Sequence, residues 1–222
     1  MVVGLTFAAL SALAGQTDLP PFSAVKVYES TETLADGTHI SRVKQKTLTF
    51  RDSQGRTRDE PVANAARETA PTSPSEQEIK IHDPVAGFEL LLYPAQKTAR
   101  RTPIALQPAL GPSIGSLPDV PQAKHESLGT EVIEGERCDG QRMQTTMPVG
   151  SLGNDREIVD TTEFWISEEL RALVLMRHTN LRYGNFTSRL TEIKRGEPDP
   201  RLFQIPFDYR IEDQPAPGQK KQ

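Results

Sequence analysis

The chain has 222 residues, of which 36% are hydrophobic and 25% charged, so it can bury one sizeable core although it is more polar than an average globular protein. Its 26 basic and 30 acidic side chains give a formal net charge of −4, which provides no electrostatic reason to expect a nucleic-acid partner. Cys138 is the single cysteine, which excludes an intrachain disulfide. Because Asp139-Gly140 is a turn signal, we expect Cys138 to be partly exposed.

The N-terminal stretch has the pattern of an export signal. Residues 2–13 are apolar, and Ala12-Leu13-Ala14 has the small-x-small pattern of a signal peptidase site. The run is shorter than the roughly 20 apolar residues that a membrane-spanning helix needs. We predict a signal peptide over residues 1–15, a periplasmic or secreted location, and no membrane span in the mature chain. A buried N-terminal helix is the alternative.

Turn signals at regular intervals separate segments that have the composition of strands. "FSAVKVYESTETL" and "HISRVKQKTLTFRD" flank Asp36-Gly37, which is typical of a hairpin. "EIKIHD" and "GFELLLYP" form a second hairpin, and a short strand follows near "KTARR". "ESLGTEVIEG" and "CDGQRMQTTMPVG" form a third hairpin, and "REIVDTTEFWIS" continues the sheet. The β-branched and aromatic content favours strands over helices.

The stretch "EFWISEELRALVLMRH", residues 163–178, can be read as a helix or as a hairpin. A helix could bury Leu170, Leu173 and Val174 on one stripe. However, the apolar residues of "EFWIS" and "RALVLMRH" alternate, and the flanking strands need antiparallel neighbours. Glu168-Glu169-Leu170 fits a short connection between two strands. The pattern therefore favours the hairpin.

These elements predict one mainly β domain over residues 20–211, with an antiparallel meander and at most short helices. The connections at 61–76 and 103–122 are long and rich in proline, which is typical of functional loops or linkers. Asp199-Pro200 predicts one short helical turn, with Asp199 as N-cap. Residues 212–222 are read as a disordered tail.

One short motif resembles a catalytic site. Gly111-Pro-Ser113-Ile-Gly115 matches the nucleophile elbow of serine hydrolases, and Asp155 and His178 follow in the hydrolase chain order. The motif needs a strand-turn-helix, whereas here it lies in a proline-rich connection, so we interpret it as a chance match. A hydrolase that uses Ser113 or a composite histidine site is the least favoured alternative.

The histidines give no metal-binding pattern. His82-Asp83 and His125-Glu126 are adjacent pairs, and adjacent residues of a strand point to opposite faces. The sequence therefore gives no reason to expect a metal or another cofactor, and we predict that the protein is not an enzyme.

Large apolar side chains on both faces of several predicted strands indicate either a two-sided core or a sheet whose one face lines a cavity. Methionine suits a site for flexible apolar ligands because its side chain is adaptable. The predicted cavity lining is Trp165, Met143, Met147, Leu92 and Val174. An apolar or lipid-like ligand is the favoured partner, and an envelope protein bound through exposed strand edges is the alternative.

A resemblance to a known family follows from the C-terminal half. "EFWIS", a turn, "LVLMRHTN" and "GNFTSRLTEIKRGEPDPRLFQIPFDYRI" resemble the end of the periplasmic lipoprotein-carrier (LolA/LolB-like) superfamily. The resemblance implies an incomplete antiparallel barrel that encloses an acyl chain or engages a partner. The sequence departs from these carriers in lacking long amphipathic helices, and no ligand residue is carried over.

Overall fold

The computed structural model describes residues 19–34, 36–62, 78–104, 120, 123–180 and 184–216. The predicted signal peptide, Ser113 and most of the two proline-rich connections lie outside these residues. So do residues 217–222 of the predicted tail.

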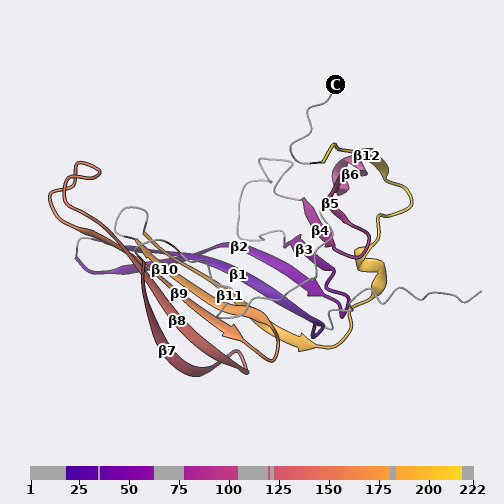
Figure 1. Ribbon diagram of the computed structural model, residues 1–222. Helices are drawn as coiled ribbons and strands as arrows, with labels where there is room; N and C mark the ends of the chain where they lie inside the picture. The colour runs from indigo at the N-terminus through magenta and orange to yellow at the C-terminus, as the bar shows by residue number, and fades with distance from the viewer. Residues whose placement is uncertain are drawn as a thin grey trace, which may run out of the picture.

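The described residues form a twelve-stranded sheet in the order β12-β6-β5-β4-β3-β2-β1-β11-β10-β9-β8-β7, drawn in Figure 1. The strands from the first half of the chain are β1 (Phe22–Thr33), β2 (His39–Arg51), β3 (Thr57–Pro61), β4 (Ile79–Asp83), β5 (Phe88–Tyr93) and β6 (Thr98–Pro103). Those from the second half are β7 (Lys124–Ile133), β8 (Glu136–Met147), β9 (Ile158–Ser167), β10 (Ala172–Asn180), β11 (Gly184–Arg195) and β12 (Arg210–Asp213). The sheet is open, which confirms the predicted mainly β half-barrel.

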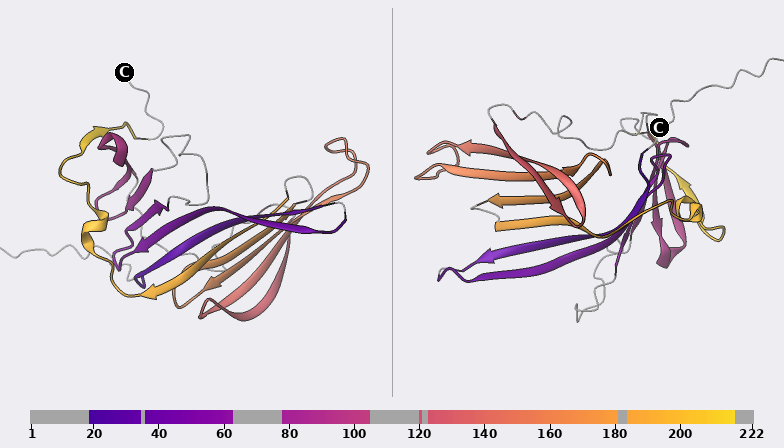
Figure 2. Two further views of the ribbon diagram at one scale, coloured as in Figure 1. Left: turned by 180° about the vertical axis from the view of Figure 1, so that it is seen from behind. Right: turned by 90° about the horizontal axis from the view of Figure 1, so that it is seen from below.

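The topology consists of two antiparallel meanders. Strands β1–β6 pair in chain order, as do β7–β11, and the pairing of β1 with β11 joins the two series. The parallel pairing of β12 with β6 brings the C-terminal end beside the first meander. The long strands of β7–β11, β1 and β2 run side by side, whereas the short strands β3–β6 stand at one end (Figures 1 and 2).

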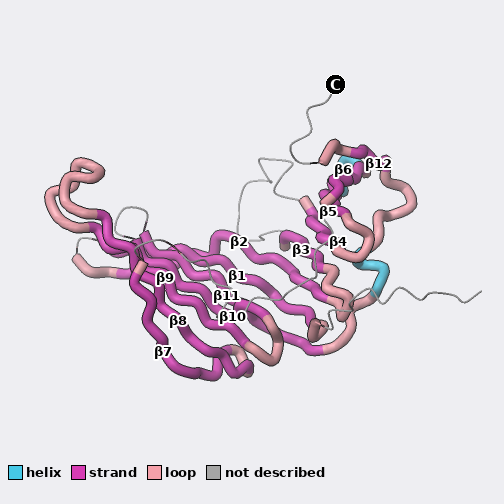
Figure 3. The backbone as a smooth tube through the Cα atoms, viewed as in Figure 1, coloured by secondary structure: helices cyan, strands magenta, loops and turns pink. Residues whose placement is uncertain are grey.

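The hairpin reading of residues 163–178 is confirmed. Strand β9 ends at Ser167, β10 begins at Ala172, and Ala172 pairs with Ser167. The turn between them has Arg171 at φ 48°, and the amide of Leu170 donates to Ser167 Oγ at 3.0 Å. Helical structure is confined to two short turns, η2 (Pro94–Gln96) and η4 (Pro200–Phe203), among the described residues (Figure 3).

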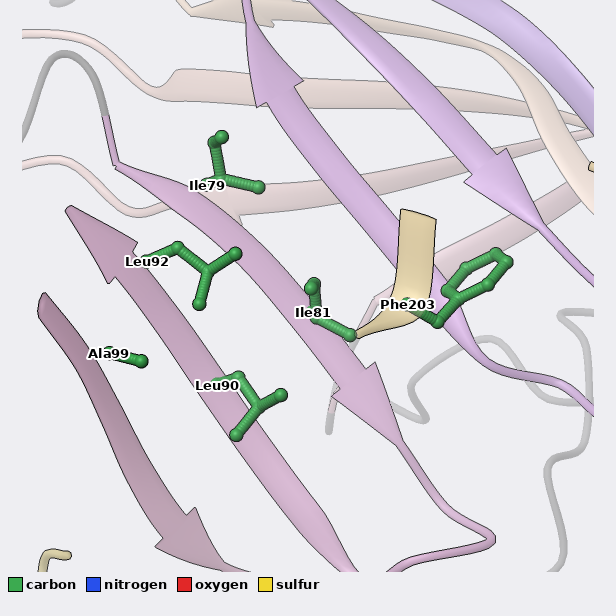
Figure 4. Close-up of a cluster of buried hydrophobic side chains, with 6 residues drawn as sticks. All are labelled: Ile79, Ile81, Leu90, Leu92, Ala99 and Phe203. Carbon is green, nitrogen blue, oxygen red and sulfur yellow. The ribbon is translucent and has the colours of Figure 1, made fainter. Parts of the chain in front are cut away.

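The predicted helical turn after Asp199 is also confirmed. Asp199 caps η4 by accepting a hydrogen bond from the amide of Arg201 at 2.9 Å, and Pro200 occupies the first turn. Phe203 of this turn packs against a cluster formed by Ile79, Ile81, Leu90, Leu92 and Ala99, as Figure 4 shows. The C-terminal segment therefore covers one face of β4–β6.

Two further apolar clusters are formed mainly by the long strands. Phe22, Ala24, Leu170, Ala172 and Leu190 form one, and Cys138, Trp165, Val174 and Leu175 form the other. Ile193 packs against both clusters. The apolar core is thus distributed along the sheet, because the described residues form no second layer across most of it.

Candidate ligand-binding face

One face of the sheet, called the groove face below, carries two cavities lined by described residues. The register sets Ser188 of β11 opposite both Tyr28 of β1 and Met176 of β10, and directly opposed residues share a face. Tyr28 in turn is opposite Gln45 of β2. The groove face is thus defined by Gln45, Tyr28, Ser188 and Met176, and it runs across four strands.

The larger cavity has a volume of about 500 Å³. It is lined by Lys26, Tyr28, Gln45, Thr47, Asp59, Pro61, Glu78, Lys80 and Ser188. A second cavity of about 270 Å³ has the apolar side chains of Phe22, Leu173 and Leu190 in its lining and shares Lys26 and Ser188 with the first. The two cavities are therefore neighbours across β1 and β11.

Ion pairs line the larger cavity. Lys26 Nζ of β1 lies 2.8 Å from Asp59 Oδ2 of β3, across the intervening strand β2. Asp59 also accepts a hydrogen bond from the Thr49 hydroxyl. Lys80 Nζ lies 3.1 Å from Glu89 Oε2. The groove face is hollowed at this point, where β1, β2 and β3 contribute side chains to the same cavity.

The hydroxyl of Tyr93 interacts with Glu78, a residue that lines the larger cavity. Burial and a hydrogen bond with Glu78 raise the pKa of Tyr93. Tyr93 also accepts a hydrogen bond from Arg100 Nη1 at 3.3 Å, and the Arg100 guanidinium lies 5.0 Å from the ring centroid. Tyr93 thus links Glu78, which lines the cavity, to β5.

A row of aromatic and methionine side chains extends from the larger cavity toward β8. The Tyr28 ring lies 5.6 Å from Phe186, and Phe186 stacks on His178 at 4.5 Å between centroids. Met176 pairs with Phe164 of β9, on the same face. The side chains of Phe164, Met176 and Phe186 are half-buried. The groove face thus presents apolar surface beside the charged cavity.

A polar network lies beside Met176 and Phe164 of this row, between Phe186 and Met143. Thr162 Oγ1 lies 2.9 Å from His178 Nδ1, His178 Nε2 lies 3.2 Å from Asp160 Oδ1, and Asn180 donates to Asp160 at 2.7 Å. The order hydroxyl, imidazole, carboxylate is that of a hydrolytic triad. Both strands that carry these residues are paired on each side, so their amides are used in the ladders rather than presented as an oxyanion hole.

The arrangement of Thr162, His178 and Asp160 therefore serves to satisfy polar side chains on a largely apolar face. Among the described residues, no group of three or more His, Cys, Asp and Glu is placed to hold a metal ion. Helices long and apolar enough to cross a membrane are also absent from the described part of the chain.

A buried arginine, which the sequence analysis did not single out, closes one end of the groove face. Arg51 is 6% exposed. Its Nη1 donates to the Arg171 carbonyl at 2.7 Å, its Nη2 donates to Pro20 at 2.7 Å and also to Leu170, and its guanidinium lies 4.7 Å from the Phe22 ring centroid. Burial lowers the pKa of Arg51 to about 10. This side chain ties β2 to the turn between β9 and β10.

The five predicted cavity residues are not brought together. Met143 is opposite Thr162 and Met147 is opposite Ile158, so both methionines lie on the groove face, where they are half-buried. Trp165 neighbours Phe164 in β9 and so points to the opposite face, where it packs with Val174. Leu92 belongs to the separate cluster beneath Phe203.

The expectation that Cys138 is partly exposed is wrong. Cys138 is fully buried beside Trp165, and burial raises the pKa of its thiol to about 11. Gly140 is not in a turn, because it lies within β8 opposite Trp165. The indole ring lies over it, with Cζ3 2.6 Å from the position that a Cβ would occupy.

Comparisons with known proteins give matches among solved structures. No protein-family model and no curated protein matches the chain. An uncharacterized conserved protein from Thermus thermophilus is 9% identical, with a TM-score of 0.48, over 88% of this chain and 91% of that chain. A LolA-superfamily protein from Nitrosomonas europaea is 9% identical, with a TM-score of 0.35, over 83% of this chain and 90% of that one.

The Pseudomonas aeruginosa MucA/MucB complex also contains a similar chain, at 12% identity and a TM-score of 0.46, with 90% of this chain covered. The match spans about 60% of that chain's length. The resemblance to lipoprotein carriers thus recurs among the structural matches. Because every one of these TM-scores is below 0.5, the likeness carries no conclusion about function.

Proposed function

We propose that this protein is an exported, non-enzymatic binding protein whose half-barrel holds an apolar, lipid-like ligand on its groove face. The observation that supports the proposal is the apolar row of Phe164, Met176 and Phe186, which lies half-buried next to the two cavities. Half-buried aromatic and methionine side chains on a concave surface are typical of sites for flexible apolar molecules. The apolar run at residues 2–13 supports export.

The test compares two substitutions in one strand. Phe164→Gln removes apolar surface from the groove face, whereas Val159→Gln alters the opposite face of β9, where Val159 is 40% exposed. Both proteins are purified without detergent and examined by native mass spectrometry with an added single-chain lipid. We expect the wild type and Val159→Gln to retain the lipid and Phe164→Gln to lose it, with a similar Tm for all three proteins.

Two results would count against this function. If the wild type carries no lipid and takes up none, the groove face does not bind apolar ligands. If Phe164→Gln and Val159→Gln bind equally well, binding occurs elsewhere. The Tm values separate these results from a general loss of folding.

A second candidate function, an envelope module that binds a protein partner, is favoured by one observation. Strand β7 is ten residues long, lies at one edge of the sheet and is largely exposed. An open edge offers unpaired backbone groups to an added strand. A replacement of Thr130 by Pro would block such pairing, so pull-down of an envelope protein by the wild type but not by Thr130→Pro would favour this function.

A further inference from the structure

The larger cavity on the groove face is lined by charges of alternating sign. Lys26 on β1 bonds Asp59 on β3, and Asp59 is directly opposite Lys80 on β4. Lys80 in turn bonds Glu89 on β5. Glu78, two residues before Lys80, adds a further carboxylate to the lining. Glu89 lies outside the lining, so the lining itself has two ammonium groups, Lys26 and Lys80, and two carboxylates, Asp59 and Glu78.

These charges are accessible to a ligand. The side chains of Lys26 and Asp59 are each 38% exposed, and that of Lys80 is 52% exposed. Ion pairs between side chains this exposed contribute little to stability, so a bound ligand can replace them at little cost. Arg51, in contrast, is buried and uses its donors on backbone carbonyls, so it is not available to a ligand.

The charged cavity and the apolar row are continuous. Tyr28 and Ser188 line the cavity. The Tyr28 ring lies against Phe186, and Met176 and then Phe164 follow Ser188 across the strands. On β8, Met143 is diagonal to Phe164, because Met143 is opposite Thr162. Adjacent strands are about 4.8 Å apart, so the four steps from β1 to β8 span about 19 Å. A molecule with a polar end in the cavity would lay an extended apolar chain along this row.

We propose that the ligand is a zwitterionic amphiphile, with its charged head group among Lys26, Asp59, Glu78 and Lys80 and its acyl chain along the apolar row. The inference rests on the function proposed above. A phosphate placed between the two lysines gains favourable contacts, while an ammonium on the same head group faces Asp59 and Glu78. A purely anionic head group is repelled by Asp59 and Glu78 and brings no ammonium group to offset this repulsion. A neutral head group removes water from the four charged side chains and offers them no opposite charge in its place.

The experiment uses three single-chain lipids with the same acyl group: lysophosphatidylethanolamine, which is zwitterionic, lysophosphatidylglycerol, which is anionic, and monoacylglycerol, which is neutral. Binding to the full chain is measured by calorimetry below the micelle concentration. We expect lysophosphatidylethanolamine to bind at least about fivefold more tightly than either of the others, a difference of about 1 kcal/mol in binding free energy.

Two variants locate the preference. Lys80→Met removes one ammonium from the cavity, and the affinity for lysophosphatidylethanolamine should fall to within about twofold of that for monoacylglycerol. Lys124→Met, on the exposed strand β7, serves as the control and should keep the wild-type preference. Circular dichroism checks that both variants are folded.

The binding results distinguish a failure of the head-group inference from a failure of the proposed function. If all three lipids bind the wild type equally, or if lysophosphatidylglycerol binds most tightly, the head-group inference is wrong while the apolar site stands. If Lys80→Met keeps the full preference, the head group lies outside this cavity. If none of the lipids binds, the proposed function fails, and the head-group inference fails with it.

Discussion

At the scale of single residues, the contact between Gly140 and Trp165 shows how one small side chain makes room for a large one. The Trp165 ring carbons Cζ3, Cε3 and Cη2 lie 2.6–2.8 Å from the place of a Cβ on Gly140. A methyl group there would force a buried ring to move, and overpacking of this kind typically costs about 1–3 kcal/mol. We therefore expect Gly140→Ala to lower the free energy of unfolding by an amount in that range, measured by urea denaturation followed by circular dichroism.

A double-mutant cycle separates this contact from other effects of the substitution. In a Trp165→Leu background the smaller side chain leaves room for the methyl group, so Gly140→Ala should cost less than in the wild type. An equal cost in both backgrounds would show that the ring is not what Gly140 accommodates.

At the scale of elements, the position of the turn between β9 and β10 depends on a side chain from β2. Arg51 donates to the carbonyls of Leu170 and Arg171 in this turn and to that of Pro20. Arg51→Met would leave these acceptors without their donor, at about 1–3 kcal/mol for each that stays buried. We expect a loss of stability in urea and faster hydrogen exchange at the Leu170 amide.

Two further variants test the role of the guanidinium. Arg51→Lys keeps the charge but lacks the planar fork that reaches several carbonyls, so it should behave like Arg51→Met. Arg137→Met, an exposed position on β8, should change stability by less than about 0.5 kcal/mol. Rescue by Arg51→Lys would mean that charge alone holds the turn.

At the scale of the whole molecule, the sequence predicts local pairing better than it predicts which face each strand buries. Hairpins are local, so turn signals such as Asp36-Gly37 and the alternation in "RALVLMRH" predict them correctly. The sequence analysis assigned Trp165 and Met143 to the same cavity because both side chains are large and apolar. Their separation depends on the register between β8 and β9, because a slip of one residue would move a side chain to the other face. The pairing of β1 with β11 joins strands that lie far apart in the sequence, so no local signal predicts it.

The same long-range pairing couples the two halves of the sheet during unfolding. Phe203 covers the cluster of β4–β6, whereas Trp165, the single tryptophan, lies in the cluster of β8–β10. Continuous ladders through β3, β2, β1 and β11 join these clusters. Phe203→Ala should cost about 3–5 kcal/mol, and the transition seen by Trp165 fluorescence should shift together with that seen by far-ultraviolet circular dichroism. If only the circular dichroism transition moved, the ladders would not couple the halves, and ligand binding at their junction would then be expected to stabilise one half alone.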